Sequence, residues 1–462
     1  EIFTTGNTLS LHDALPIWCR PTGAGSGVGV PLSFPAERGG MTDADSSTAG
    51  DSGAAAPDGS GAETSADSEA STPNGAGSDD GFDAESDSAA GSDSDAESES
   101  RLLVYGAYGY TGRLIVEAAV ERGLGPVVAG RDVTKTRGVA TANGLKARTF
   151  PVETAAEHLG DVDAVLNCAG PFAGTADAMA DACIETETHY LDITGELAVF
   201  ERISRRDADA AAAGVTLLPG VGFDVVPTDC LAAHLHRRLP EATHLSLALE
   251  ADGGVSPGTL KTVLSDLRAG GAVRRDGDLR YERVGARTRV VDFGDGLRRA
   301  VSIPWGDVST AYHTTGIPNV DVYLSLPANA RRAVALSAYA GGALDSDALQ
   351  RGLSWLVDRY VDGPDEETRA TGESRVWGEA RSSDDRVVSR LRTPETYRLT
   401  VRTALLIATK VLGGEAPVGY QTPAGAFGPD LILDVPGVER VDVEDGEVVE
   451  HASEPSTSRA AE

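Results

Sequence analysis

The chain has 462 residues, with 71 Asp and Glu side chains against 40 Lys and Arg and a formal net charge of −31. This surplus of acid excludes electrostatic capture of nucleic acid or of an anionic membrane surface as the default role. Four cysteines are too few for a disulfide scaffold, and no apolar run approaches the ~20 residues that span a bilayer. We therefore expect a soluble cytoplasmic protein of two or three domains, compatible with peripheral membrane association and with a homo-oligomer.

The first hundred residues differ in composition from the rest. Residues 1–40 show no helical or strand period, lack the basic and apolar segments of a signal peptide, and contain a stretch at 8–17 that resembles translated adaptor sequence. We expect them to be a non-native leader, with Met41 as the natural start. Residues 42–100 hold 16 acidic and no basic side chains, so 41–100 is predicted to be a disordered acidic tail, either solvating or an interaction arm. The acid surplus and the four lysines of the chain indicate a halophilic, salt-adapted protein.

A strand, a glycine-rich turn and a helix are predicted for residues 102–123. An apolar run at 102–105 predicts a buried strand, and the apolar spacing of 113–123 predicts an amphipathic helix. Glycines in G-x-x-G-x-x-G spacing permit a tight turn, close approach of a diphosphate and packing of helix on strand. An ordinary surface turn is the alternative. The predicted cofactor-binding residues here are Gly106, Tyr108, Gly109, Tyr110, Thr111 and Gly112. The two tyrosines are expected to pack over adenine or ribose, with proton donation as their alternative role.

The next predicted strand, at 126–130, ends in Arg131, where an NAD site usually has an acid. A guanidinium suits a 2′-phosphate, so the sequence predicts NADP(H) rather than NAD. The alternative is that Arg131 forms a surface ion pair with Asp132.

A third strand is predicted at 162–172 and ends in a Gly-Pro turn. Main-chain atoms of Ala169, Gly170 and Pro171 are predicted to line the nicotinamide half of the cofactor, and Cys168 is predicted to be a small buried side chain. The alternation of strand and helix continues, with helices predicted at 177–186 and 198–213 and strands at 189–193 and 214–219. Residues 101–228 are therefore predicted to be an α/β Rossmann-type domain with a doubly wound parallel sheet.

Four blocks in this order, at residues 106–112, 167–172, 190–196 and 219–229, resemble the saccharopine dehydrogenase-like oxidoreductases. The branch that includes trans-acting enoyl reductases of lipid biosynthesis is the closer match, and residues 421–428 are similar to its C-terminal motif. The resemblance covers about residues 101–432. It implies an NADP-binding Rossmann domain followed by an α+β domain, and it names no substrate.

Residues 229–432 are predicted to form this second α+β substrate domain. Helices are expected at 230–239 and 258–267, and alternating apolar residues at 281–303 and 319–326 indicate an antiparallel sheet with further strands at 375–380 and 387–392. A helix at about 394–412 is expected to return to the Rossmann domain and form a cleft with it. Residues 433–462 are expected to be a partly disordered extension.

No catalytic constellation stands out, so the catalytic residues are left unknown. His189, Asp192, Thr194 and Glu196 are placed at the carboxyl edge of the sheet, either near substrate or as a strand end and helix cap. Asp224 and Asp229 either orient substrate or hold a hinge, with capping of the following helix by Asp229 or Thr228 as the alternative. The histidines and cysteines lack metal-ligand spacing, so no metal is expected.

These observations favour an NADP-dependent oxidoreductase that transfers hydride to an unsaturated or imine-type small-molecule or lipid-like substrate. The enoyl- or prenyl-lipid substrate, and a role in lipid biosynthesis, follow from the resemblance alone. Saccharopine or amino-acid dehydrogenase chemistry, and a non-catalytic NADP-binding scaffold, remain alternatives.

Overall fold

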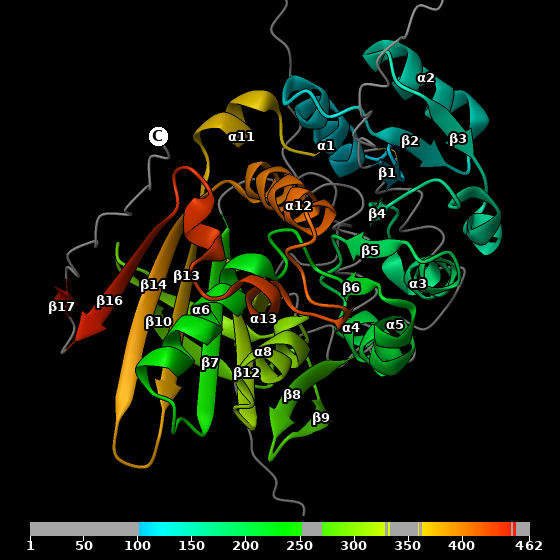
Figure 1. Ribbon diagram of the computed structural model, residues 1–462. Coiled ribbons are helices and arrows are strands. Elements are labelled where there is room, and N and C mark those ends of the chain that lie inside the picture. Colours follow the sequence, from blue (N-terminus) through cyan, green and yellow to red (C-terminus); the bar gives the residue numbers. More distant parts are fainter. Residues whose placement is uncertain are drawn as a thin grey trace, which may run out of the picture. The chain divides into compact units, whose positions relative to one another are not determined.

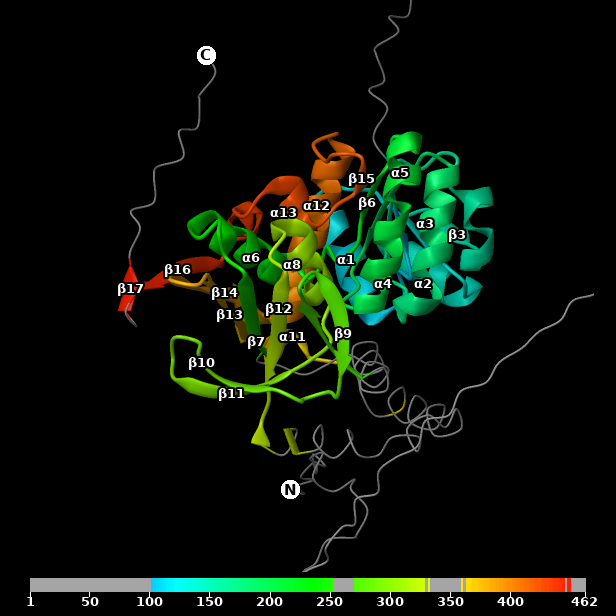
Figure 2. The same cartoon turned by 90° about the horizontal axis from the view of Figure 1, so that it is seen from below.

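The computed structural model describes residues 101–251, 270–328, 331–332, 359, 363–444 and 447–449 (Figure 1). The expectations for the leader, the acidic tail and a helix at 258–267 lie outside these residues. The described residues all belong to one compact unit of the chain, Gly91–Glu462. They build two sheets and the helices that cover them (Figures 1 and 2).

The first sheet has seven strands, all paired in parallel, in the order β15-β6-β5-β4-β1-β2-β3. The predicted doubly wound Rossmann sheet is thereby confirmed. Its order reverses between β1 and β4, so the turns after these two strands lie next to each other at the carboxyl edge. The strands are β1 Leu102–Tyr105, β2 Val127–Gly130, β3 Ala147–Thr149, β4 Ala164–Asn167, β5 His189–Asp192, β6 Thr216–Leu218 and β15 Gly419–Tyr420.

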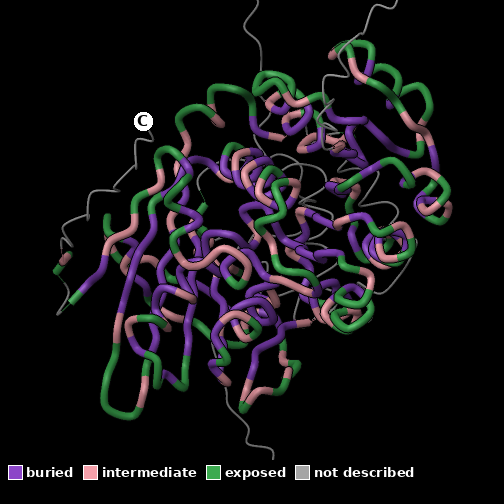
Figure 3. Tube along the Cα trace, in the orientation of Figure 1, coloured by how far each residue is buried: buried purple, intermediate pink, exposed green. Residues whose placement is uncertain are grey.

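Helices cover both faces of this sheet, because its strands are apolar on both sides. Leu103 and Tyr105 belong to one buried cluster, and Leu102 and Val104 to another on the opposite face. Figure 3 shows buried residues along the strands and many exposed residues on outer helices such as α2. The helices are α1 Tyr110–Glu121, α2 Val133–Asn143, η2 Val152–His158, η3 Phe172–Gly174, α3 Ala176–Glu185, α4 Leu197–Ile203, η4 Ser204–Arg206 and α5 Asp207–Ala213.

The helix predicted over 198–213 is interrupted, because α4 and α5 are separated by the short η4. The Ser204 hydroxyl donates to the Glu201 carbonyl at 3.2 Å. This local bond competes with regular helical pairing. The Arg206 guanidinium donates to the Asp181 carboxylate on α3.

The second sheet has ten strands in the order β10-β11-β12-β7-β13-β14-β16-β17, with the β8–β9 hairpin attached to β12. The segments expected to form an antiparallel sheet do pair antiparallel, as β10 with β11, β11 with β12 and β13 with β14, whereas β7 and β12 run parallel, so the sheet is mixed. The chain between them includes a crossover through α8 (Asp307–Thr315), which a parallel pair requires. The strands are β7 His244–Ala251, β8 Gly271–Arg275, β9 Asp278–Glu282, β10 Thr288–Asp292, β11 Leu297–Ser302, β12 Asn319–Ser325, β13 Glu373–Arg381, β14 Arg386–Pro394, β16 Glu439–Glu444 and β17 Glu447–Val449.

Helices α6 (Val226–Arg238) and α8 pack against each other beside this sheet, and α6 also packs on β13 and β14. The remaining helices are α11 Glu366–Thr371, α12 Thr396–Leu412, α13 Pro423–Phe427 and η6 Leu431–Asp434. Helix α12 contacts α1 and β4 as well as β14 and α11, so it joins the two sheets (Figure 1). Its Thr400 and Thr403 hydroxyls bond to the backbone of Phe223 and Val221, in the loop after β6.

Candidate functional site

The glycine turn after β1 leaves no room for side chains. Gly106 has φ +78°, and a Cβ there would lie 2.7 Å from the backbone nitrogen of Ala169. A Cβ on Gly112 would lie 2.5 Å from the Gly106 carbonyl oxygen. Gly109 is the N-cap of α1, and no side chain caps this helix. The first N–H groups of α1 therefore remain available, together with the positive end of its dipole, for an anion such as a diphosphate.

The end of β2 carries the charge expected for a 2′-phosphate site. Asp132 caps α2, since its carboxylate accepts the N–H of Lys135 at 3.0 Å. The ion pair recorded for Asp132 is with the Lys135 ammonium, at 4.0 Å. In the described ranges the exposed guanidinium of Arg131 has no recorded ion pair. The alternative Arg131–Asp132 pair is therefore not formed.

Tyr108 and Tyr110 lie in different surroundings. A Cβ on Gly130 would meet the Tyr108 ring at 2.6 Å, so this ring packs at the end of β2 beside Arg131. The Tyr110 hydroxyl instead donates to the Pro364 carbonyl at 2.5 Å, and its ring lies edge-on to Tyr397 of α12. Tyr108 thus has the position expected of an adenine or ribose contact. The Tyr110 side chain holds α1 to the second domain, and only its backbone, with that of Thr111, lies in the first turn of α1.

The turn after β4 is held by side chains on both sides. The Ala169 N–H donates to Asn167 Oδ1 at 3.0 Å, and its carbonyl accepts the Thr175 hydroxyl at 2.8 Å. Glu196 accepts the N–H groups of Phe172 and Ala173 at 2.7 and 2.9 Å. Gly170 and Pro171 are left exposed at the rim, where they are available to a cofactor. Burial raises the pKa of the Cys168 thiol far above its usual value, which argues against a nucleophilic cysteine.

The polar residues of β5 have structural partners. Burial raises the pKa of Asp192 to about 6. Its carboxylate accepts the Tyr190 hydroxyl at 2.6 Å and the N–H groups of Thr194 and Gly220 at 2.9 Å. The placement of His189 at the carboxyl edge is wrong, because His189 is the first residue of β5 and therefore lies at the opposite edge. Its Nδ1 accepts the Thr216 N–H at 3.0 Å.

Three carboxylates gather where the loop after β6 meets α8, and of these Asp229 and Asp307 are fully buried while Asp224 is half-buried. Asp224 lies in that loop, Asp229 in the first turn of α6 and Asp307 at the start of α8. Asp229 is paired, since it accepts the Thr314 hydroxyl at 2.5 Å and the Ala424 N–H at 2.7 Å. Helix α6 begins at Val226 without a side-chain cap, so the capping role considered for Asp229 and Thr228 is wrong. Thr228 donates to the Val225 carbonyl instead.

Asp224 is the member of this group that borders the cofactor side of the sheet. A Cβ on Gly195, in the loop after β5, would lie 2.9 Å from the Cβ of Asp224. Its buried Oδ1 has no hydrogen-bond partner in the described part of the chain, and the nearby Trp305 indole lowers the pKa of this carboxyl group against the larger effect of burial. Burial raises the pKa of Asp224 to about 7. A carboxyl group with this pKa is partly protonated at neutral pH and can act as an acid.

Asp307 and Trp305 are absent from the sequence-based candidates. Asp307 is fully buried, and neither carboxylate oxygen has a hydrogen-bond partner among the described residues. Trp305 pairs through its backbone with Glu196, and the Gly306 N–H donates to the Gly195 carbonyl at 2.9 Å. Only the fold brings these residues to the loops after β5 and β6, which lie about 110 and 80 residues away in sequence. No local pattern around them could have indicated a site.

We expect Asp307→Asn to stabilise the protein more at pH 8 than at pH 5. Burial raises the pKa of Asp307 well above its usual value, so the folded chain keeps a proton that the unfolded chain has lost. Stability then falls as pH rises above the unfolded pKa, and a neutral amide removes this fall. The expected gain at pH 8 is about 1–3 kcal/mol, measured by urea denaturation. Asp321→Asn is the matched control and should destabilise, because Asp321 pairs with Arg275. If Asp307→Asn is no more stable than the wild type at pH 8, the expectation is contradicted.

None of the helices in the described part of the chain combines the length and the apolar character that a bilayer crossing demands. Within the same residues, no three His, Cys, Asp or Glu side chains are grouped so as to hold a metal ion.

The chain resembles known proteins in its first domain. Residues 102–218 match the family model of the saccharopine dehydrogenase NADP binding domain. The chain is 32% identical over 154 residues to a trans-acting enoyl reductase of Mycobacterium leprae, covering 31% of this chain and 37% of the relative. It is 28% identical over 204 residues to a lipid droplet localized protein of Caenorhabditis elegans, covering 39% of this chain and 48% of the relative. The chain thus matches less than half the length of either relative.

The fold extends the likeness beyond the matched sequence. Saccharopine dehydrogenase (L-Glu forming) of Saccharomyces cerevisiae superimposes with a TM-score of 0.53 at 13% identity, covering 75% of this chain and all of that chain. At this identity the likeness concerns the fold alone. The predictions of saccharopine dehydrogenase-like character and of NADP as the cofactor are confirmed by the family model. Residues 102–218 of this chain thus match the NADP-binding domain of saccharopine dehydrogenases.

Proposed function

We propose that the protein is an NADP-dependent oxidoreductase that transfers hydride to a carbon–carbon double bond of an enoyl- or prenyl-lipid-like substrate. The observation that carries the proposal is the uncapped α1 N-terminus at a turn where Gly106 and Gly112 leave no room for a Cβ, within residues that match an NADP-binding domain. The enoyl substrate class is supported by the relatives named trans-acting enoyl reductase.

The described residues fit the cofactor along the carboxyl edge of the first sheet. The N–H groups of Tyr110, Thr111 and Gly112 would bind the diphosphate, since the Gly109 N–H already donates to the Gly106 carbonyl at 2.9 Å, and Arg131 with Tyr108 would hold the phosphorylated ribose and adenine. The backbone of Ala169–Pro171 would line the nicotinamide half. When bound, the cofactor supplies the hydride, and the protein orients it and keeps water out.

Asp224 is the group that we propose to supply the proton. Reduction of an enoyl double bond adds hydride to one carbon and a proton to its neighbour. Asp224 lies beside Gly195 in the loops after β5 and β6, and Glu196 ties these loops to the turn after β4. A protonated Asp224 carboxyl can deliver its proton on this edge, and solvent then restores it.

The structure gives less support to amino-acid dehydrogenase chemistry. That reaction needs free guanidinium groups for the substrate carboxylates. Arg274 is buried against Glu201, Arg275 pairs with Asp321, and Arg289 pairs with Glu379. These three arginines are occupied by carboxylates of the chain itself, whereas the exposed Arg299 on β11 has no such partner in the described ranges.

We expect Arg131→Ala to weaken NADPH binding by about 10- to 100-fold while changing NADH binding by no more than about twofold. The variant removes charge-assisted hydrogen bonds to a 2′-phosphate that NADH lacks. Fluorescence titration of both cofactors measures the difference. Arg137→Ala, an exposed arginine of α2, is the control and should leave both affinities unchanged. An equal loss for both cofactors in Arg131→Ala would refute this role.

Turnover tests the proposed function itself. The purified protein is incubated with NADPH and a panel of 2-enoyl thioesters and polyprenyl compounds, and NADPH consumption is followed together with product saturation by mass spectrometry. We expect stoichiometric consumption with at least one class. Tight NADPH binding without turnover across the panel would favour a non-catalytic scaffold. Turnover with amino-dicarboxylic substrates alone would favour the dehydrogenase alternative.

A further inference from the structure

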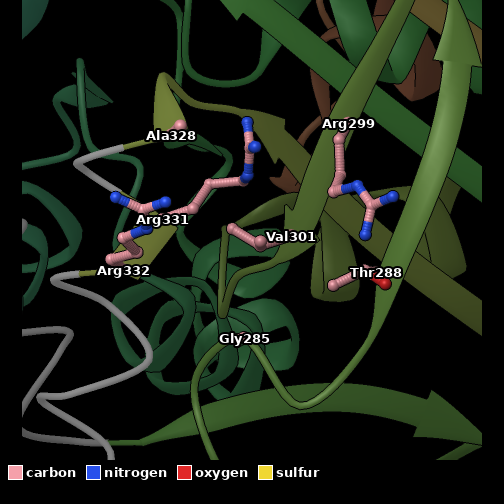
Figure 4. Close-up of a pocket in the computed structure, with 7 residues that line it drawn as sticks. All are labelled: Gly285, Thr288, Arg299, Val301, Ala328, Arg331 and Arg332. Carbon is pink, nitrogen blue, oxygen red and sulfur yellow. The ribbon is translucent and has the colours of Figure 1, made fainter.

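A pocket of about 440 Å³ lies on the second sheet, and the described residues that line it include three arginines and no acidic residue (Figure 4). Arg299 and Val301 come from β11 and Thr288 from β10, while Arg331 and Arg332 come from the segment after β12. Three chain segments therefore contribute to one basic pocket in a protein with a net charge of −31.

Neighbouring arginines differ from those of the pocket in having carboxylate partners. On the same β10–β11 hairpin, Arg289 pairs with Glu379 at 2.6 Å and Arg298 with Glu250 at 3.2 Å. For Arg299 and Arg332, both exposed, no ion pair is recorded within the described ranges. Arg331 donates one N–H to the Leu326 carbonyl at 2.6 Å, which is a neutral partner and leaves its positive charge unbalanced.

We infer that this pocket binds a phosphate or diphosphate group of the substrate. Guanidinium groups present planar pairs of donors that match phosphate oxygens, and the Thr288 hydroxyl adds a further donor. The inference rests on the proposed function, since it assigns the pocket to one end of the molecule whose double bond is reduced.

The position of the pocket indicates a long substrate. Val301 lies opposite Leu324 of β12, Leu324 opposite Leu249 of β7, and Leu249 opposite Val376 of β13. Three steps between neighbouring strands separate the pocket from β13 by about 14 Å. Strand β13 begins beside α12, whose Tyr397 contacts Tyr110 at the start of α1. A phosphate held by the arginines is thus remote from the glycine turn, as an extended lipid or carrier arm requires.

Pyrophosphate is the direct probe of this site. Calorimetric titration is done on the full chain with saturating NADP⁺, which occupies the phosphate sites of the cofactor, and at constant ionic strength. We expect pyrophosphate to bind, and the double variant Arg299→Gln/Arg332→Gln to weaken it about tenfold or more. Arg280→Gln, an exposed arginine of β9, is the control and should change binding by less than about twofold. No binding to the wild type, or equal binding to the double variant, would overturn the inference.

Kinetics distinguish the two sources of the phosphate. A polyprenyl diphosphate is compared with the free polyprenol, and an enoyl phosphopantetheine thioester with its N-acetylcysteamine analogue. The double variant should raise the KM of the phosphate-bearing compound in one of these two pairs. Its kcat, and the KM of the phosphate-free compound in the same pair, should not change. The pair that is affected shows whether the phosphate belongs to a lipid diphosphate or to a carrier arm. An unchanged KM for both would overturn the inference. If pyrophosphate binding depends on these arginines but no substrate is turned over, the pocket is a phosphate site and the proposed function is refuted.

Discussion

Gly109→Val is expected to lower NADPH affinity about a hundredfold or more while the protein remains folded. A Cβ at this position would lie 3.2 Å from the Gly106 carbonyl and 4.0 Å from the Cys168 carbonyl, so the added methyl groups enter the space between the glycine turn and the turn after β4. The loss of two charge-assisted hydrogen bonds to the diphosphate, at about 1.5–3 kcal/mol each, accounts for a change of this size.

Calorimetric titration with NADPH and with NADH checks this prediction. Both affinities should fall together, because the diphosphate is common to the two cofactors, in contrast to the selective loss expected for Arg131→Ala. The control is Gly138→Ala in α2, where an added Cβ meets no atom within 4 Å. It should keep both affinities and gain about 1 kcal/mol of stability from improved helix propensity. Retention of NADPH binding by folded Gly109→Val would contradict the assignment of the glycine turn.

Asp224→Asn is expected to reduce kcat by about 10²–10⁴-fold, the usual contribution of a general acid. Burial raises the pKa of Asp224 to about 7. The protonated form is the proton donor, so kcat of the wild type should fall as pH rises through about 7. An amide cannot release a proton, so the residual rate of Asp224→Asn should not show this fall. NADPH affinity should stay within about twofold of the wild type, since the cofactor's phosphates lie at the glycine turn.

The measurement is the pH profile of kcat for both proteins on a substrate identified by the turnover panel. Asp229→Asn separates proton donation from a loss of structure, because Asp229 is fully buried and accepts bonds from Thr314 and Ala424. It should lower stability and keep the pH profile of the wild type. A wild-type profile in Asp224→Asn, or a similar loss of kcat in both variants at equal stability, would exclude Asp224 as the donor.

The sequence predicts the cofactor-binding residues better than it predicts the proposed proton donor and its neighbours. The glycine turn and Arg131 each follow a short apolar strand, so residues adjacent in sequence define their position and their chemistry. Asp224, Trp305 and Asp307 become neighbours only through the packing of α8 against α6. Their burial, which raises the pKa of both carboxyl groups, depends on segments some 80 residues apart. Local patterns contain no information about such contacts.

In the second domain, too, the sequence predicts single strands better than it predicts how they pair. Strands β13 and β14 lie close to their predicted ranges, because each has a clear alternation of apolar residues. The parallel pairing of β7 with β12 was not foreseen, since strand direction is decided by the crossover rather than by the strand sequences. Likewise, Glu439–Glu444, assigned to a C-terminal extension, pairs with β14 as strand β16.

Strand β15 has a consequence for how the protein is made. Gly419 and Tyr420 pair with Thr216 and Leu217 of β6, about 200 residues earlier in the chain, and the Thr216 hydroxyl bonds to Pro417 at 2.9 Å. The edge of the nucleotide-binding sheet is therefore completed only after about 200 further residues have been synthesised. Until then β6 presents an unpaired edge that can recruit another chain, and contacts of such wide sequence separation form slowly. A recombinant fragment cut after residue 228 would carry this open edge permanently.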